Sequence, residues 1–256
     1  MEQTDQKVLN KLQELGQEEA ALSPLFSFYS ELFQIQSEAK SCIKIVKPVV
    51  QDELIHDRLL EGIPLLLFEE FAPDWRHVQK VFAQIIGWAG SDKVIPEVEK
   101  ENLRIISGDL PRLKRLAKAW YQGQLLESTA ETECVDFQLL ESVIADTLKP
   151  FLSVYRELLL PSVDQELWRR RFCPVCGGKP DFAYIDKEKG ARWVLCSSCD
   201  AVWLFGRVEC PYCGTQEPNS LAYYTGDSES SLYRLYVCRE CHSYIKAIDF
   251  RRTDSE

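Results

Sequence analysis

The chain has 256 residues, a formal net charge of −10 and 45% hydrophobic residues, which is typical of a globular protein with one large domain or two ordinary ones. No apolar run approaches the roughly 20 residues that a membrane-spanning helix needs, and the first residues lack the basic and apolar regions of a secretory signal. We therefore expect a cytoplasmic protein with no membrane insertion.

The negative charge is concentrated in the first part of the chain. Residues 1–170 carry 19 Lys and Arg against 28 Asp and Glu, whereas residues 171–256 carry 11 against 12. The chain thus lacks the strong positive field that usually supplies nucleic-acid affinity, so we expect no nucleic-acid partner.

Residues 1–160 read as an all-helical domain, because apolar residues recur at helical spacing. Asp74 and Asp109 stand where helix N-caps are expected, and Pro150 predicts a kink or a break in the last helix. The apolar segment from Pro64 to Phe68 is expected to fill the helical core. No catalytic constellation is visible in this part. The expected helices cover about 8–22, 23–35, 49–60, 74–89, 109–120 and 135–160.

After a predicted hinge at residues 161–172, the pattern changes to short alternating runs with glycine-containing turns, which favours β-structure. The fold class is therefore α+β and multi-domain, with a helical domain followed by two small β modules at 173–209 and 210–256. The expected strands are 182–186, 191–195, 201–207, 221–225, 232–237 and 243–249.

The β part contains an internal repeat built on cysteine pairs. Cys173 to Cys210 and Cys176 to Cys213 are 37 positions apart, and Cys196 to Cys238 and Cys199 to Cys241 are 42 apart. Each unit is a C-x2-C pair, an insert of 19 or 24 residues and a second C-x2-C pair. This is the arrangement of zinc ribbons and rubredoxins, in which two turns present four thiolates to one ion.

We therefore predict two tetrahedral four-thiolate sites, each holding one iron or zinc ion, because both metals suit this ligand set. Redox-active dithiols are the alternative, but the βαβ context of a thioredoxin-like motif is missing. Sequential ligation within each repeat is simpler than cross-braced ligation, which stays open. The predicted metal ligands are Cys173, Cys176, Cys196, Cys199, Cys210, Cys213, Cys238 and Cys241.

Other candidate residues give weaker signals. His242 follows a predicted ligand, but a complete set of four cysteines leaves it no ligand role, and we expect a histidine that is exposed or that contacts a ligand without binding the metal. The run Arg169, Arg170 and Arg171 could bind an acidic partner or form a solvated hinge. The aromatic residues near the cysteines favour a small module core over the shielding of an iron centre.

Several segments resemble the family of formate dehydrogenase accessory proteins, FdhE. They are Arg-Arg-Phe-Cys-Pro-Val-Cys-Gly-Gly-Lys-Pro at 170–180, Gly-Ala-Arg-Trp-Val-Leu-Cys-Ser-Ser-Cys at 190–199, Trp203 with Arg207, the run from Cys238 to Lys246, and Gly-Ile-Pro-Leu-Leu at 62–66. The resemblance implies rubredoxin-like metal sites at the eight cysteines. It also implies a cytoplasmic maturation factor or chaperone that binds the molybdenum- or tungsten-containing catalytic subunit of a formate dehydrogenase.

The sequence-based hypothesis is thus a binding scaffold and not an enzyme, with no catalytic or cofactor-binding residues. One alternative is a rubredoxin-like electron carrier, which requires iron. A second is a nucleic-acid-binding zinc ribbon, against which the nearly neutral cysteine modules and the acidic neighbouring domain argue.

Overall fold

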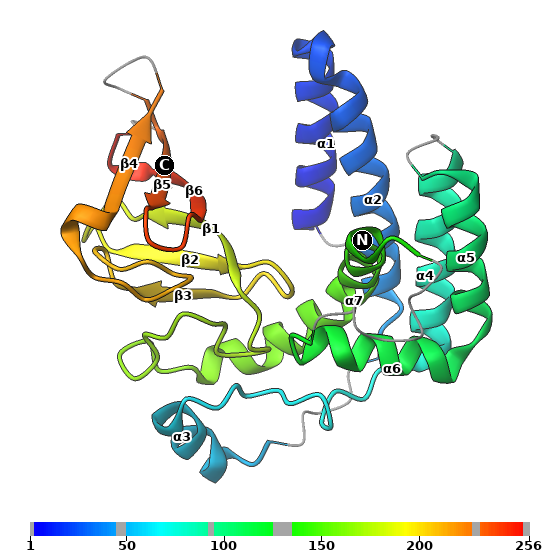
Figure 1. Cartoon of the computed structure of the whole chain (residues 1–256), viewed down its shortest axis with the longest axis horizontal. Coiled ribbons are helices and arrows are strands. Elements are labelled where there is room, and N and C mark those ends of the chain that lie inside the picture. Colours follow the sequence, from blue (N-terminus) through cyan, green and yellow to red (C-terminus); the bar gives the residue numbers. More distant parts are fainter. Residues whose placement is uncertain (1–2, 45–49, 92–94, 125–134, 227–230, 253–256) are drawn as a thin grey trace. The chain divides into compact units, whose positions relative to one another are not determined.

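The structure, a computed structural model, describes residues 3–44, 50–91, 95–124, 135–226 and 231–252 (Figure 1). The chain divides into two compact units. The first consists of residues 1–46 and 71–154, and the second consists of residues 47–70 and 155–256. The predicted fold class, a helical region followed by β-structure with two cysteine clusters, is confirmed. The domain boundaries predicted at 160, 172 and 209 stay predictions.

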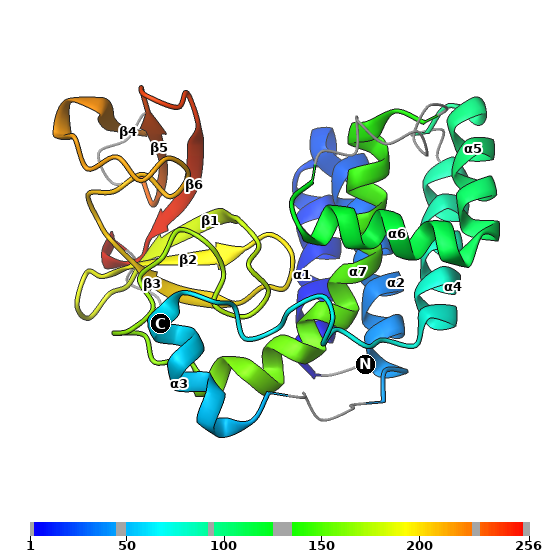
Figure 2. The same ribbon diagram turned by 60° about the horizontal axis from the view of Figure 1, so that its bottom comes forward.

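The first unit is helical, and α1 and α2 run side by side within it (Figures 1 and 2). Pro150 lies inside one continuous helix, α7, whose last residues belong to the second unit. Helix α5 was not predicted. Among the described residues no helix is both long and apolar enough to cross a membrane. The helices are α1 (Gln3–Glu18), α2 (Ser23–Ser41), α4 (Trp75–Ser91), α5 (Glu97–Gly108), α6 (Leu110–Tyr121) and α7 (Phe137–Leu159).

Two aspartates mark helix starts as the sequence predicts. Asp109 accepts a hydrogen bond from the amide of Arg112 at 3.0 Å, and Asp74 accepts one from the amide of Arg76 at 3.0 Å. Each bond satisfies an amide that the first turn of a helix leaves without a partner. The apolar faces of these helices form a core that includes Phe82, Ile85, Ile86, Leu103, Ile106 and Phe151.

The second unit is built on one six-stranded sheet with strand order β3-β2-β1-β6-β5-β4. Within each half the strands are antiparallel, and the halves join through the parallel pair of β1 and β6, from Phe182 opposite Lys246 to Ile185 opposite Asp249. All six predicted strands are confirmed to within two residues at each end. They are β1 (Pro180–Ile185), β2 (Arg192–Cys196), β3 (Val202–Phe205), β4 (Leu221–Thr225), β5 (Tyr233–Cys238) and β6 (Tyr244–Asp249).

A buried ion pair ties the second half of the sheet together. The side chain of Asp249, at the end of β6, is fully buried and lies 2.5 Å from the guanidinium of Arg234 on β5. Arg251 contacts the same carboxylate at 2.8 Å. Hydrogen bonds from Arg251 and the charge of Arg234 hold the pKa of Asp249 below its usual value.

The prediction that Pro64–Phe68 fills the helical core was wrong, because this segment belongs to the second unit. Helix α3 (Asp52–Glu61) ends at Gly62, which takes the left-handed conformation with φ 76°. The amides of Leu65 and Leu66 then donate to the carbonyls of Pro174 and Val175 at 2.9 and 2.8 Å. The apolar run is therefore buried by pairing with the backbone of the first cysteine turn.

Candidate metal centres

The first cysteine turn shows how a C-x2-C pair aims two sulfurs at one point. The amide of Gly177 donates to the carbonyl of Cys173 at 3.0 Å and closes the turn. The amides of Val175 and Cys176 point at the sulfur of Cys173, at 3.3 and 3.5 Å. Amides directed at a sulfur stabilise its thiolate form, which is the form that binds metal.

All four cysteine turns share one backbone conformation. The residue after the second cysteine has a positive φ in each: Gly177 at 75°, Asp200 at 59°, Gly214 at 81° and His242 at 55°. Glycine adopts this conformation readily, whereas other residues pay a steric cost. His242 therefore occupies a turn position in which its backbone shapes the fourth cysteine pair, and no metal contact by its imidazole is needed.

The eight predicted ligand sulfurs form two groups of four, and in each group all sulfurs lie within 4.8 Å of one another. The groups follow the repeats, with Cys173, Cys176, Cys196 and Cys199 in one and Cys210, Cys213, Cys238 and Cys241 in the other. This is the sequential arrangement, and no sulfur is shared between the repeats.

Spacings within the groups fit a metal better than a disulfide. The sulfurs of Cys176 and Cys196 are 3.5 Å apart, and those of Cys210 and Cys241 are 3.6 Å apart. A regular tetrahedron with metal–sulfur bonds of about 2.3 Å has edges of about 3.8 Å. A disulfide needs about 2.05 Å. Both clusters are therefore able to hold a metal ion, and zinc and iron fit the donor set equally.

The two clusters differ in their exposure to solvent. All four cysteines of the first cluster are buried, whereas in the second Cys213 is exposed and Cys241 is half-buried. Gly178 contributes to the closure of the first cluster, because a Cβ there would lie 2.9 Å from the sulfur of Cys196. Thr215 occupies the equivalent position of the second repeat. The first site is thus closed to chelators and oxidants, and the second is partly open.

Protonation also differs among the sulfurs of the second cluster. Burial raises the pKa of Cys210 to about 12. Desolvation acts on Cys241 too, but hydrogen bonds from Ser243 and from Cys210 and Cys238 bring its pKa down to about 6. Because a metal must displace the thiol protons, metal affinity at this site falls as the pH falls.

The arginine run at 169–171 has structural contacts that the sequence did not predict. Arg170 donates to the carbonyl of Leu60 at 2.8 Å and lies against Gly62, where a Cβ would overlap its guanidinium. Arg171 donates to the carbonyl of Tyr212 at 2.5 Å. Arg170 therefore holds the end of α3, and Arg171 links the approach to the first turn with the third.

The aromatic residues near the clusters mainly build the core of this unit. Trp203 and Trp168 are fully buried, and Phe205 is nearly so. The indole nitrogen of Trp203 donates to the carbonyl of Arg170 at 2.9 Å, and that of Trp168 donates to Phe172 at 2.9 Å. Buried indoles with satisfied N–H groups are expected of a core.

Part of this unit matches a known family model. Residues 172–207 match the model described as FdhE, central domain. The chain is 26% identical over 247 residues to the FdhE homolog of Aquifex aeolicus (strain VF5). This alignment covers 95% of this chain and 82% of that protein. It is 33% identical over 85 residues to the FdhE homolog of Haemophilus ducreyi, covering 32% of this chain but only 27% of that relative.

A solved structure has the same fold. The crystal structure of the FdhE protein from Pseudomonas aeruginosa superposes with a TM-score of 0.63 and 20% identity. The superposition covers 96% of this chain and 84% of the other. The likeness therefore extends over the helical part as well as over the cysteine clusters.

Proposed function

We propose that the chain belongs to the FdhE family, since it is similar to an FdhE homolog over most of its length, and that it is an accessory factor that binds the catalytic subunit of a formate dehydrogenase during assembly. In this role the metal-held ribbons form a recognition scaffold and perform no reaction of their own. The proposed location is the cytoplasm, where a reducing environment keeps paired cysteines free to bind metal.

The observation that carries this proposal is the closed ligand set of the two clusters. Each cluster supplies four sulfurs to one point. A metal with four protein ligands stabilises structure, whereas a catalytic metal keeps an open position for water or substrate. Such a metal would fix the two turns of each ribbon, and with them the loops around the clusters.

Exposed tyrosines on the second ribbon also support the proposed role in binding a partner protein. Tyr223, Tyr224, Tyr233 and Tyr244 are 53 to 67% exposed on strands β4, β5 and β6. Exposed tyrosines are common where one protein binds another, because they offer large contact area and a hydroxyl group at low entropic cost. The stiff sheet beneath them would lower the cost of ordering this surface on binding.

The proposal is tested by co-purification. The affinity-tagged chain is expected to retain a formate dehydrogenase catalytic subunit from its source organism, and deletion of its gene is expected to abolish formate dehydrogenase activity. Cys196→Ser should lose both properties, since it removes one ligand of the buried cluster. Cys42→Ser is the matched control, because Cys42 is exposed and lies outside both clusters. An unaffected enzyme in the deletion strain would refute the proposal.

A second function, electron transfer by a bound iron, is favoured by the exposure of the second cluster. Cys213 is exposed, and an exposed thiolate ligand gives a short path to a redox partner. This function requires iron, since zinc has no redox chemistry in proteins. Elemental analysis of anaerobically purified protein decides the matter: a content of zinc alone excludes electron transfer and leaves the binding role intact.

A further inference from the structure

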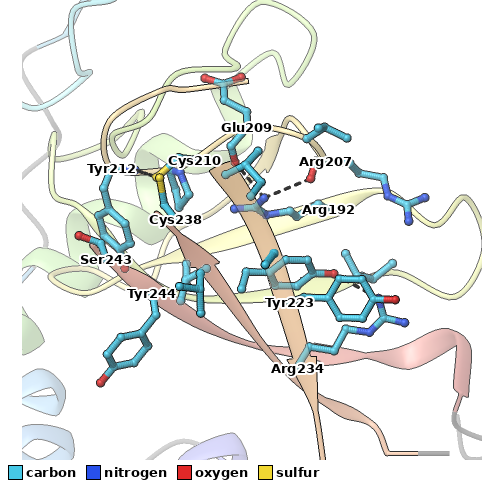
Figure 3. Close-up of a pocket in the computed structure, with 18 residues that line it drawn as sticks. Arg192, Arg207, Glu209, Cys210, Tyr212, Tyr223, Arg234, Cys238, Ser243 and Tyr244 are labelled. Carbon is cyan, nitrogen blue, oxygen red and sulfur yellow. Dashed lines mark hydrogen bonds between the residues drawn. The ribbon is translucent and has the colours of Figure 1, made fainter. Parts of the chain in front are cut away.

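A cavity of about 470 Å³ lies beside the second cluster, on the second half of the sheet (Figure 3). Its walls come from β2, β4, β5 and β6, from the end of β1 and from the turn that leads to Cys210. Most of the lining is apolar or aromatic, including Tyr223 and Tyr236, but three arginines also line it: Arg192, Arg207 and Arg234. A pocket of this size accepts a small ligand or a few residues of a peptide.

Arg192 is the unusual member of the lining. Only 2% of it is exposed, and among the described residues it forms no ion pair. Its Nη1 donates to the carbonyl of Glu209 at 3.1 Å and more weakly to those of Gly206 and Arg207, both at 3.4 Å. Its Nε and Nη2 are buried and have no hydrogen-bond partner. A buried cation without a counter-charge is costly, so an anion that reached it would be held strongly.

Among the described residues no carboxylate is hydrogen-bonded to Arg192, and Glu209 and Cys210 act on its charge only through space. The carboxylate of Glu209 accepts a hydrogen bond from Gln216 at 3.2 Å, while only the backbone of Glu209 contacts Arg192. Arg234 is paired with Asp249 and lies 4.8 Å from the ring of Tyr223. The cavity therefore contains a buried guanidinium that has no bonded carboxylate among the described residues.

The two unpaired nitrogens of Arg192, Nε and Nη2, also indicate which chemical group they could bind. The Nε and Nη2 of one guanidinium are parallel donors that match the two oxygens of a carboxylate. The guanidinium also lies over the rings of Phe205 and Tyr236, 5.4 and 5.3 Å from their centroids, and its edge with Nε and Nη2 has no hydrogen-bond partner.

From this geometry we propose that the cavity binds a carboxylate carried on an apolar body, with Arg192 as the group that holds the two carboxylate oxygens. Apolar walls and a single free donor edge favour a monovalent carboxylate over a strongly hydrated phosphate dianion. Both nitrogens are covered in the free protein, so the ligand displaces side chains of the cavity wall as it binds. The cavity shares Tyr223 and Tyr244 with the surface proposed for partner binding, but the assembly role does not depend on carboxylate binding.

Calorimetric titration of the purified, metal-loaded full chain tests the proposal. N-acetyl-L-phenylalanine presents a chain-terminal carboxylate, and N-acetyl-L-aspartyl-L-phenylalaninamide presents a side-chain carboxylate. The affinities of these two acids show whether the cavity prefers a chain-terminal carboxylate or a side-chain carboxylate. N-acetyl-L-phenylalaninamide keeps the apolar body without the charge. We expect at least one acid to bind saturably and the uncharged amide to bind at least about tenfold more weakly.

Three variants complete the test. Arg192→Met removes the charge at similar volume, which should preserve the fold and abolish carboxylate binding. Arg192→Lys keeps a charge but loses the paired donors, so binding should weaken by about tenfold or more. Arg169→Met is the control, because Arg169 is exposed, pairs with Glu166 and lies outside the cavity.

Circular dichroism and metal content establish that each variant is folded. Equal binding of the acids and the amide, or undiminished acid binding by a folded Arg192→Met protein, would overturn the proposal. It would also be overturned if neither acid bound the wild type. Loss of metal from the second cluster in Arg192→Met would then show that Arg192 balances the charge of the thiolates instead. Since no partner protein is present, failure here leaves the assembly role untouched.

Discussion

Gly177→Ala tests how the first cysteine turn is joined to the segment after α3. Gly177 has φ 75°, and a Cβ there would lie 3.2 Å from Cγ of Pro64. Gly214, its equivalent in the second repeat, has φ 81°, and a Cβ there would lie 3.2 Å from Cδ of Arg171. The two substitutions therefore impose the same backbone strain but meet different neighbours, one a rigid ring and the other a flexible side chain.

The expected costs follow from these contacts. Left-handed backbone costs a non-glycine residue about 1–2 kcal/mol, and the lost flexibility of the unfolded chain returns about 0.5–1 kcal/mol. Gly214→Ala should therefore destabilise its turn by about 1 kcal/mol. Gly177→Ala adds overpacking against Pro64, which costs about 1–3 kcal/mol more. Pro64 cannot rotate away, because Leu65 and Leu66 are bonded to the same turn.

Hydrogen exchange measures this difference locally, which suits a metal-binding chain of two units whose unfolding need not be two-state. The amides of Leu65 and Leu66 should exchange about tenfold faster or more in Gly177→Ala, and at the wild-type rate in Gly214→Ala. Equal acceleration in both variants, or none in Gly177→Ala, would refute the reasoning that Pro64 and Gly177 are packed against each other.

Three further predictions concern the second unit. Asp249→Asn leaves Arg234 without its counter-charge, so the thermal midpoint should fall by an amount equivalent to about 2–3 kcal/mol at neutral pH. Because the pKa of Asp249 is lowered, its stabilising effect is complete above the unfolded value and is lost as the pH falls through the folded value. The difference between wild type and Asp249→Asn should thus shrink below about pH 4, and a constant difference would argue against the ion pair. Gly178→Ala should impair metal retention at the first cluster, since its Cβ would approach the sulfur of Cys196. Thr215→Ala, at the equivalent position of the second repeat, should not impair it. Native mass spectrometry counts the retained ions. With a chelator in excess, the cluster that contains the exposed Cys213 should release its metal first, and simultaneous loss from both clusters would contradict the difference in exposure.

The sequence predicted those parts of the fold that depend on local pattern. The strands alternate, the C-x2-C pairs carry their own turn chemistry, and the offsets between repeats divide eight cysteines into two sets. The position of Pro64–Leu66 was predicted wrongly, because an apolar segment is expected to be buried but its composition does not identify the residues that it packs against. Only the tertiary fold reveals that its amides pair with Pro174 and Val175.

Long-range partners explain the remaining misses. Arg170 and Arg171 look like a charged run, yet their acceptors are carbonyls of Leu60 and Tyr212, which are 110 and 41 positions away. Arg192 stands in a strand that alternates regularly, and nothing in that pattern indicates an unpaired guanidinium beside a cavity. That no carboxylate of the described residues is hydrogen-bonded to it is a property of the assembled sheet.

The parallel pairing of β1 and β6 also constrains how this unit folds. β1 is made first among the strands and β6 last, so one edge of β1 has no partner while β2 to β5 are synthesised. An unpaired edge strand is prone to join other chains. The first ribbon can bind its metal early, but the sheet closes only when β6 docks. A nascent chain stalled before Tyr244 should therefore be the form most exposed to aggregation, even with its first metal site complete.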